Sequence, residues 1–250
     1  MFSRQAAIPP ALQVGIERLN TRFSPSLNGS LHLGHLAMAW VNMTYAKDRD
    51  GQFILRFDDL APRIAGDDVS KMSQWALEAE SLLREAGIIP DRVTSVSDYT
   101  PAEAVLGDTV GGRNRWIRAA DFEGHDNLLC SPGLVRARVR ADIAENIGAV
   151  IRGDELLVEL QLYESLNAEM GGSPRDMIFL PRLRVREEGV VTTISKTVGN
   201  LQLRDLFRVQ SPEAWLHQLR AVLLIDPDAP LSWENIHPYP IIDAYSTRVK

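Results

Sequence analysis

The residues best suited to chemistry form a glycine-rich stretch with two histidines, Gly29-Ser30-Leu31-His32-Leu33-Gly34-His35. At the start of a helix such a stretch can seat phosphates, because the first turn has unpaired N–H groups and the positive end of the helix dipole. Gly34 would let the backbone approach a nucleotide. His32 and His35 could donate hydrogen bonds to phosphate oxygens that gain charge during attack on an α-phosphorus. Both histidines could instead cap the helix or satisfy polar groups of the core, so the stretch alone favours neither interpretation.

The residues around this stretch predict a strand, a helix and a second strand. Residues 14–23 contain a predicted strand, and the Pro, Asn, Gly and Ser residues at 24–30 predict a turn. A helix follows, because apolar residues recur at helical spacing at Leu36, Trp40, Met43 and Ala46. Residues 53–57 are short, largely apolar and closed by two aspartates, which predicts a strand. This order opens a βαβ unit, so we predict an α/β fold with a Rossmann-like parallel sheet.

The rest of the chain predicts further elements around this sheet. Residues 67–86 have apolar side chains on one helical face and are followed by Gly87, which predicts an amphipathic helix. Residues 106–134 have no clear period, and we interpret them as an excursion from the core. The other expected elements are strands near 149–151, 177–180 and 190–194 and helices over 156–168, 201–207 and 212–224. Residues 226–250 hold four prolines and are expected to wrap the surface.

Composition and charge exclude several classes of protein. The 250 residues are 45% hydrophobic and 24% charged, as in ordinary globular proteins, and no apolar run approaches the ~20 residues of a membrane-spanning helix. The single cysteine, Cys130, excludes an intramolecular disulfide and a multi-cysteine zinc site. The formal charge of -6 disfavours a broad nucleic-acid surface, and residues 1–12 lack a secretory signal pattern. We therefore expect a cytoplasmic protein with no zinc and no membrane partner.

Four sequence blocks resemble, in order, those of the class I glutamyl- and glutaminyl-tRNA synthetases. Residues 22–35 are similar to the signature of that family, and residues 51–59 resemble the strand ending in acids that follows it. Residues 150–156 resemble its Val-Ile-Arg-Gly segment, and residues 193–197 resemble its K-M-S-K-S loop. Four matching blocks in the order of the family arise by chance much less often than a single matching block.

The resemblance implies substrate-binding roles for five residues. Arg22 would pair with a glutamate side chain, a task that suits a planar guanidinium, while Ser24 and Ser26 would line the same pocket. Asp58 would meet the substrate ammonium, and Arg152 would lie near the substrate carboxylate. Each of these side chains could instead be structural, as a turn former, a cap or half of a salt bridge.

The resemblance also implies how ATP is bound and activated. His32, His35 and Lys196 would be catalytic, with Lys196 steadying the leaving pyrophosphate. The residues expected to bind the nucleotide are Asn28, Gly29, Gly34, Leu180 and Ser195. Mg²⁺ is expected to enter with ATP.

The sequence also departs from this family. Thr193 stands where the first lysine of the loop is usual, and Leu134 falls where the family has a tyrosine in the amino-acid pocket. We expect residues 1–207 to form the catalytic domain, with its insertion cut down to about 106–134, and residues 208–250 to form a C-terminal helical segment and tail without an anticodon-binding domain. In size the chain is similar to truncated glutamyl-queuosine tRNA synthetases, but it lacks their zinc cysteines.

These observations predict a ligase that uses ATP to form an aminoacyl-adenylate, with a glutamate-like amino acid as substrate. The acyl acceptor would be a tRNA, a small molecule or a carrier protein. Two alternatives stay open. One is a degenerate synthetase paralogue with a binding or regulatory role, and the other is a small nucleotidyltransferase or pantothenate-type ligase with a His-x-Gly-His loop.

Overall fold

The computed structural model describes most of the chain. The described residues are 19–65, 69–106, 109–110, 113–114, 117–118, 129–130, 132–187, 189–194, 202–224, 226, 228, 235–238 and 240–243. None of the helices formed by these residues combines the length and the hydrophobicity needed to cross a lipid bilayer.

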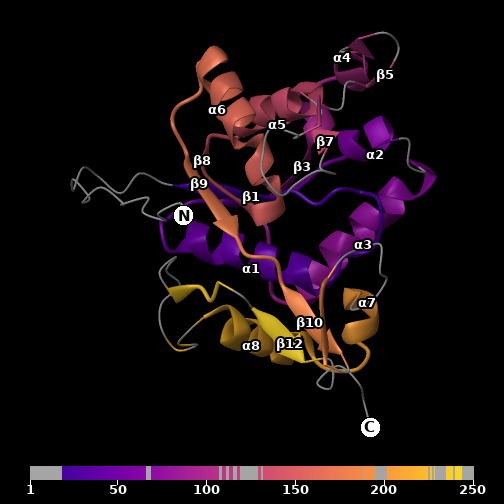
Figure 1. Cartoon of the computed structure of the whole chain (residues 1–250), viewed down its shortest axis with the longest axis vertical. Coiled ribbons are helices and arrows are strands. Elements are labelled where there is room, and N and C mark those ends of the chain that lie inside the picture. Colours follow the sequence, from indigo (N-terminus) through magenta and orange to yellow (C-terminus); the bar gives the residue numbers. More distant parts are fainter. Residues whose placement is uncertain are drawn as a thin grey trace.

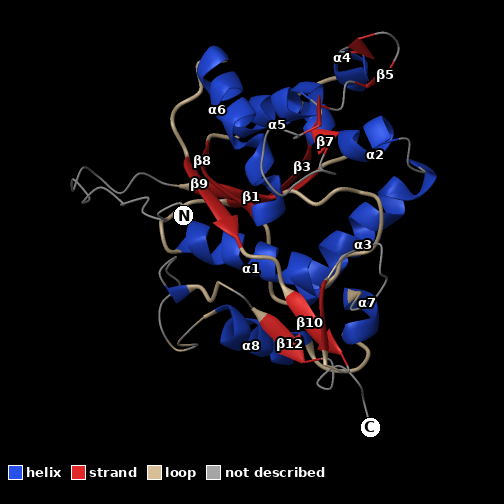
Figure 2. Cartoon of the chain, in the orientation of Figure 1, coloured by secondary structure: helices blue, strands red, loops and turns tan. Residues whose placement is uncertain are grey.

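A five-stranded sheet lies at the centre of the molecule (Figures 1 and 2). Its strands are β1 (Asn20–Phe23), β2 (Phe53–Phe57), β3 (Arg92–Ser95), β8 (Ile147–Gly153) and β9 (Asp176–Leu180). They pair in the order β3-β2-β1-β8-β9, and every pair is parallel. The chain builds outward from β1 to β2 and β3 on one side and then returns to place β8 and β9 on the other. The predicted Rossmann-like parallel sheet is therefore confirmed.

Four helices cover this sheet. They are α1 (Leu33–Lys47), α3 (Met72–Glu85), α5 (Pro132–Ala144) and α6 (Leu160–Glu169). In Figure 1, α5 and α6 lie on one side of the sheet and α1 and α3 on the other. The helix expected around Leu36 is confirmed as α1. The helix expected over 67–86 is confirmed as α3 from Met72 to Glu85, while residues 67 and 68 lie outside the described residues, and Gly87 follows α3 with a φ of +72° that favours glycine.

Helix α5 was not predicted from the sequence. Between Leu134 and Ala141, apolar residues alternate strictly with arginines, a pattern of period two that is typical of a strand. The segment is nevertheless helical, because it is buried on more than one side and one of its inward faces carries charge. Arg138 and Asp142 share that face at a spacing of four residues, and Glu145 follows three residues later. Because charged residues occupy this inward face, the pattern of hydrophobic residues does not show the helical period.

The reduced insertion lies mostly outside the described residues. The described elements near it are the helix α4 (Ala102–Leu106) and four short strands. The strands β4 (Thr109–Val110) and β5 (Arg113–Asn114) form one antiparallel pair, and β6 (Ile117–Arg118) and β7 (Leu129–Cys130) form another. Short helical segments elsewhere are α2 (Leu60–Ala65) and the 3₁₀ turns η1 (Val69–Lys71), η2 (Val96–Asp98) and η3 (Asp154–Glu159).

A second, small sheet lies beside α1 together with two helices (Figure 1). Its strands are β10 (Arg184–Glu187), β11 (Val190–Thr193) and β12 (Ile241–Asp243), and the helices are α7 (Leu203–Leu206) and α8 (Pro212–Leu223). Trp215 of α8 is fully buried in the same hydrophobic cluster as Leu36 of α1. The expectation that residues 226–250 wrap the surface is wrong for 241–243, since this strand pairs with β10 and buries Ile242. An apolar Ile-Ile pair directly after Pro240 was the signal for it.

Candidate active site

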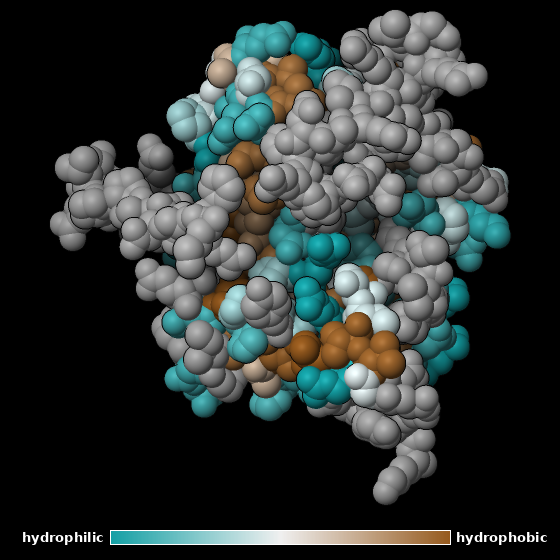
Figure 3. Space-filling model, viewed as in Figure 1, coloured by the Kyte–Doolittle hydropathy of each residue, from teal (hydrophilic) through white to brown (hydrophobic). Residues whose placement is uncertain are grey.

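A cavity of about 520 Å³ opens at the carboxyl ends of the central strands. It is lined by residues that follow or end β1, β2, β8 and β9 and by the first turn of α1. Since β1 leads to β2 on one side and is paired with β8 on the other, the cavity lies where the strand order reverses. Ligands of open α/β sheets bind at this point. In Figure 3, hydrophilic surface lies at the centre of this face, between hydrophobic surface near β9 and over β10 and β12.

The cavity gathers ten of the residues predicted from the sequence. They are Arg22, Ser24, Ser26, Asn28, His32, Gly34, His35, Asp58, Arg152 and Leu180. Gly29 lies on the same turn but does not line the cavity. Ser195 and Lys196 lie outside the described residues. Of the two departures from the family pattern, Thr193 lines the cavity and Leu134 is buried in a separate hydrophobic cluster.

The two histidines form the entry of α1. His32 is the N-cap residue, and its Nδ1 accepts a hydrogen bond of 3.1 Å from the N–H of Gly34. The Nδ1 of His35 accepts one of 3.1 Å from the N–H of His32, and the ring centroids lie 3.8 Å apart. A neutral imidazole whose Nδ1 accepts carries its proton on Nε2. Helix capping, which was the structural alternative, is thus present, and it fixes Nε2 as the donating atom of each ring.

Gly34 allows the close approach of His32 to the helix. A Cβ at this position would meet the His32 ring at 3.1–3.2 Å, tighter than ordinary van der Waals contact. The turn before the helix is held on two sides. Asp58 donates its N–H to the carbonyl of Pro25 at 3.0 Å, and Leu203 donates its N–H to the carbonyl of Leu31 at 2.9 Å. The ends of β2 and α7 therefore fix the position of this turn.

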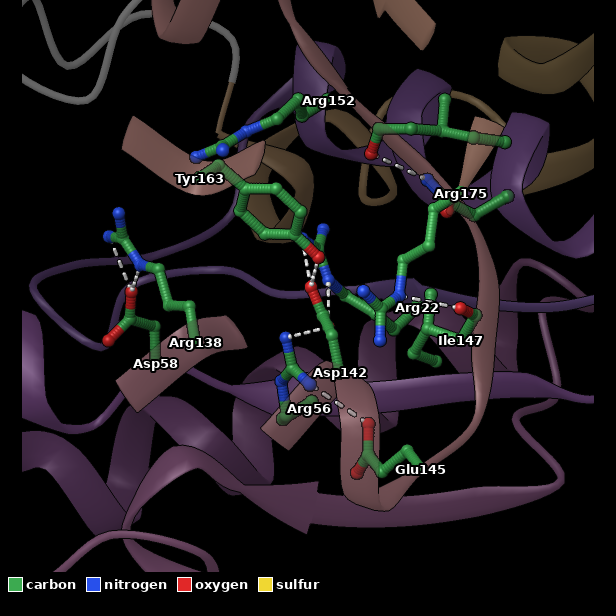
Figure 4. Close-up of polar contacts among 12 residues, drawn as sticks. Arg22, Arg56, Asp58, Arg138, Asp142, Glu145, Ile147, Arg152, Tyr163 and Arg175 are labelled. Carbon is green, nitrogen blue, oxygen red and sulfur yellow. Dashed lines mark hydrogen bonds and ion pairs between the residues drawn. The ribbon is translucent and has the colours of Figure 1, made fainter. Parts of the chain in front are cut away.

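Beneath the cavity lies a first chain of alternating charges, Glu145–Arg56–Asp142–Arg22 (Figure 4). Arg56 donates to Asp142 at 2.6 Å and to Glu145 at 3.0 Å, while the Nε of Arg22 lies 3.1 Å from Asp142. Tyr163 donates its hydroxyl to Asp142 at 2.6 Å. Burial works to raise the pKa of the Asp142 carboxyl, but the charges of Arg22 and Arg56 outweigh it and hold that pKa below its usual range.

A second chain, Asp58–Arg138–Glu159–Arg152, lies beside the first. Arg138 donates to Oδ2 of Asp58 from Nε at 2.9 Å and from Nη2 at 2.7 Å, and its Nη1 lies 3.2 Å from both oxygens of Glu159. Arg152 donates to Glu159 at 2.7 Å. Burial works to raise the pKa of Glu159, and the guanidinium groups of Arg138 and Arg152 outweigh it, so that this pKa is lowered.

Three of the predicted substrate-binding residues therefore already have charged partners in the protein. Arg22 is paired with Asp142, Asp58 with Arg138, and Arg152 with Glu159. Sequence reasoning missed the partner residues Arg56, Arg138, Asp142, Glu145, Glu159 and Tyr163. A helical interpretation of residues 132–145 would have found the Arg138, Asp142 and Glu145 face, and no signal in the sequence indicated Glu159 or Tyr163.

The two lowered carboxyl pKa values predict how stability depends on pH. Asp142 and Glu159 have pKa values in the folded state below those of the unfolded chain, which are about 4. The unfolded state therefore binds more protons as the pH falls through this range, and the stabilisation present above it is lost. We expect the free energy of unfolding, measured with urea, to decrease from about pH 5 to pH 3.

A variant that lacks one of these two carboxyl groups provides the control. Glu159→Gln removes one of the two titrating groups, so its free energy of unfolding should depend less steeply on pH than that of the unchanged protein. Equal stability at pH 5 and pH 3 in the unchanged protein would contradict the assignment of lowered pKa values.

Comparison with known proteins identifies the relatives of this chain. Residues 18–101 match the family described as tRNA synthetases class I (E and Q), catalytic domain. A glutamate-tRNA ligase of Pyrococcus furiosus is 35% identical over 91 residues, which are 36% of this chain and 15% of that protein. Glutamate-tRNA ligase 1 of Rickettsia bellii is 62% identical over 39 residues, which are 16% of this chain and 9% of that protein. The matched stretches are thus a small part of these relatives.

Solved structures show the same fold over a larger part of the chain. A glutamate-tRNA ligase from Elizabethkingia meningosepticum, in complex with its amino acid, superposes with a TM-score of 0.68 at 17% identity, over 92% of this chain and 68% of that one. A tyrosyl-tRNA synthetase from Archaeoglobus fulgidus gives 0.57 at 14% identity, over 85% and 69% of the two chains. Residues 18–101 thus match the family of class I glutamyl- and glutaminyl-tRNA synthetase catalytic domains, and the described part of the chain shares the fold of such enzymes.

Proposed function

We propose that this protein uses ATP to activate a small carboxylic acid of amino-acid size, as an acyl-adenylate. The observation that carries this proposal is the sharing of one cavity by His32 and His35 at the start of α1 and by Arg22 and Arg152 at the carboxyl ends of β1 and β8. Helix-entry donors suit phosphate oxygens, and buried guanidinium groups suit a carboxylate. The expected glutamate-like substrate is consistent with the glutamate-tRNA ligases among the relatives.

In the activation step, a carboxylate oxygen of the acid attacks the α-phosphorus of ATP. A bond forms between that oxygen and the phosphorus, the bond from the phosphorus to the bridging α,β-oxygen breaks, and pyrophosphate leaves with the electron pair. The protein contributes orientation and charge stabilisation. The Nε2–H groups of His32 and His35 would donate to phosphate oxygens that gain charge in the transition state, each lowering the barrier by on the order of 3 kcal/mol.

Several other residues would hold the nucleotide. Asn28, Gly29 and Leu180 are proposed to contact ATP, together with Ser195 of the loop segment. Lys196 is proposed to steady the pyrophosphate, since Ile194, two residues before it, lines the cavity and Gln202, six residues after it, forms a β-bridge with His32. Mg²⁺ would enter with the triphosphate and would neutralise part of its charge.

A second step transfers the acyl group to an acceptor. A nucleophilic oxygen, nitrogen or sulfur of the acceptor attacks the acyl carbon, loses its proton, and AMP leaves with the carboxylate-derived oxygen. The acceptor is proposed to be a tRNA, a small molecule or a carrier protein. Aminoacylation of a tRNA pool, followed by acid gel electrophoresis, would distinguish the tRNA from the other two.

Two measurements test activation. Exchange of radiolabelled pyrophosphate into ATP should depend on an added carboxylic acid, and mass spectrometry of the incubated mixture should detect an acyl-AMP whose mass identifies the acid. We expect both signals with at least one member of a pool of amino acids and their des-amino analogues. Absence of both signals with every acid, alone or with tRNA, would overturn the proposal.

A second function, binding without turnover, is favoured by the internal pairing of Arg22, Asp58 and Arg152. A site whose charges are neutralised within the protein can bind a nucleotide without activating a second substrate. Calorimetric titration that detects ATP binding in the absence of any exchange or acyl-AMP would favour this function over activation.

A further inference from the structure

Both carboxylate oxygens of Asp58 already accept hydrogen bonds within the protein. Its Oδ1 accepts the N–H of Ala61 at 3.1 Å, and its Oδ2 accepts two hydrogen bonds from Arg138, at 2.9 and 2.7 Å. The Asp58 side chain is 2% exposed and that of Arg138 is 16% exposed, and both residues line the cavity. Figure 4 shows the guanidinium of Arg138 directed at this carboxylate. A cation of the protein therefore occupies the position at which a substrate ammonium was expected.

Arg138 is itself held firmly in this position. Its Nη1 is bound to both oxygens of Glu159, so the guanidinium bridges two buried carboxylates. A planar guanidinium with two such partners is a strong and directional arrangement. Displacing it to make room for an ammonium would leave Glu159 with one fewer partner. A substrate ammonium would thus have to break this bridge.

The walls of the cavity favour an anion. Its described charged lining consists of Arg22, Arg56, Arg138, Arg152 and Arg182 against the single carboxylate of Asp58. The partner acids Asp142 and Glu159 lie behind this lining. Burial lowers the pKa of Arg152, and the positive charges of Arg138 and Arg22 act in the same direction against the opposing effect of Glu159. A further cation here would meet the same repulsion, and an anion would relieve it.

Three buried polar atoms of the lining residues have no hydrogen-bond partner among the described residues. They are Oγ of Ser24, Nε of Arg56 and Nε of Arg152. Buried polar groups are nearly always hydrogen-bonded, so unpaired ones beside a cavity are available to a bound ligand. All three atoms can donate to a carboxylate, and a guanidinium Nε cannot bind an ammonium.

From these contacts we propose that the acid bound here carries no free α-ammonium, and that its class is a des-amino carboxylic acid. Arg138 then acts as a specificity residue that occupies the ammonium position. This inference rests on the proposed function for the reaction, but binding of the acid can be measured without turnover. Failure of the inference about the acid is therefore distinguishable from failure of the proposed reaction.

The test compares matched pairs of acids that differ only in the ammonium group. Suitable pairs are glutarate with glutamate, succinate with aspartate, and 4-methylpentanoate with leucine. Binding to the full chain, in the presence of a non-hydrolysable ATP analogue, is measured by calorimetric titration, and pyrophosphate exchange is measured separately. In any pair that binds, we expect the des-amino acid to bind at least tenfold more tightly and to support the faster exchange.

The possible outcomes distinguish this inference from the proposed function. Tighter binding of des-amino acids without exchange supports the inference and overturns the proposed function. Exchange that prefers free amino acids supports the function and overturns the inference. If no acid of any pair binds, the inference is overturned as well.

A variant tests whether Arg138 sets this preference. Arg138→Gln removes the charge and exposes the Asp58 carboxylate to an ammonium, so the preference should shift by at least tenfold toward amino acids. Arg136→Gln on the same helix is the matched control, because Arg136 pairs with Glu169 at an exposed site and does not line the cavity. An unchanged preference in a folded Arg138→Gln protein would overturn the role of this residue, and the comparison of acids in the unchanged protein stands without the variant.

Discussion

Replacing Asp142 with asparagine is expected to lower the free energy of unfolding by about 3–5 kcal/mol. Asp142 has no exposed surface and neutralises two buried guanidinium groups, those of Arg22 and Arg56. Asparagine preserves the volume of the side chain, so the loss reflects charge and hydrogen bonding and not a cavity. The amide would remove the charge that neutralises Arg22 and one of the two that neutralise Arg56, and it would offer Tyr163 one fewer acceptor. Breaking a buried ion pair costs far more than breaking a surface pair.

Urea unfolding followed by circular dichroism at pH 7 measures this loss. The matched control is Glu169→Gln, which breaks an ion pair of α5 in which the two side chains are 42% and 60% exposed. That change should cost less than about 1 kcal/mol, because solvent screens an exposed pair. If the two variants lose the same small amount of stability, Asp142 does not hold the charge arrangement together.

Replacing His32 with asparagine is expected to slow pyrophosphate exchange about 100-fold while leaving the folded state intact. Asparagine is among the best N-cap residues, so its side chain can accept the hydrogen bond from the N–H of Gly34 that the imidazole now accepts. The variant loses the Nε2–H donor, whose proposed partner is a phosphate oxygen that gains charge during attack. The loss should therefore fall mainly on kcat and less on KM for ATP.

The control is a cap of another helix. Ser211 caps α8, where its side chain accepts from the N–H of Ala214, and it does not line the cavity. Ser211→Asn should leave the exchange rate unchanged. If the His32→Asn protein has an unchanged exchange rate and unchanged thermal stability, His32 acts only as a helix cap.

The sequence predicted the parts of the site that depend on local patterns. The turn before α1, the two histidines and the strands β1 and β2 fall within forty consecutive residues, and each is specified by its own residue types and spacing. Because parallel strands present their carboxyl ends at one edge of a sheet, the residues after β1, β2 and β8 had to meet once the sheet was correct.

The charge chains could not be predicted in the same way. Arg138 bonds to Asp58 across 80 residues of sequence, and Arg22 bonds to Asp142 across 120. No local pattern links such partners. The alternation of apolar residues and arginines also concealed the helix that carries Arg138 and Asp142, so the face that completes the site had no recognisable period.

The closed charge chains also determine how the site responds to salt. Each chain contains two cations and two anions, so it carries no net charge, and its members are largely shielded from water. Mobile ions screen buried pairs far less than exposed ones, such as the pair of Arg182 and Asp154 at the cavity edge. Raising the ionic strength should therefore weaken the exposed pair of Arg182 and Asp154 while leaving the geometry of the buried charge chains unchanged.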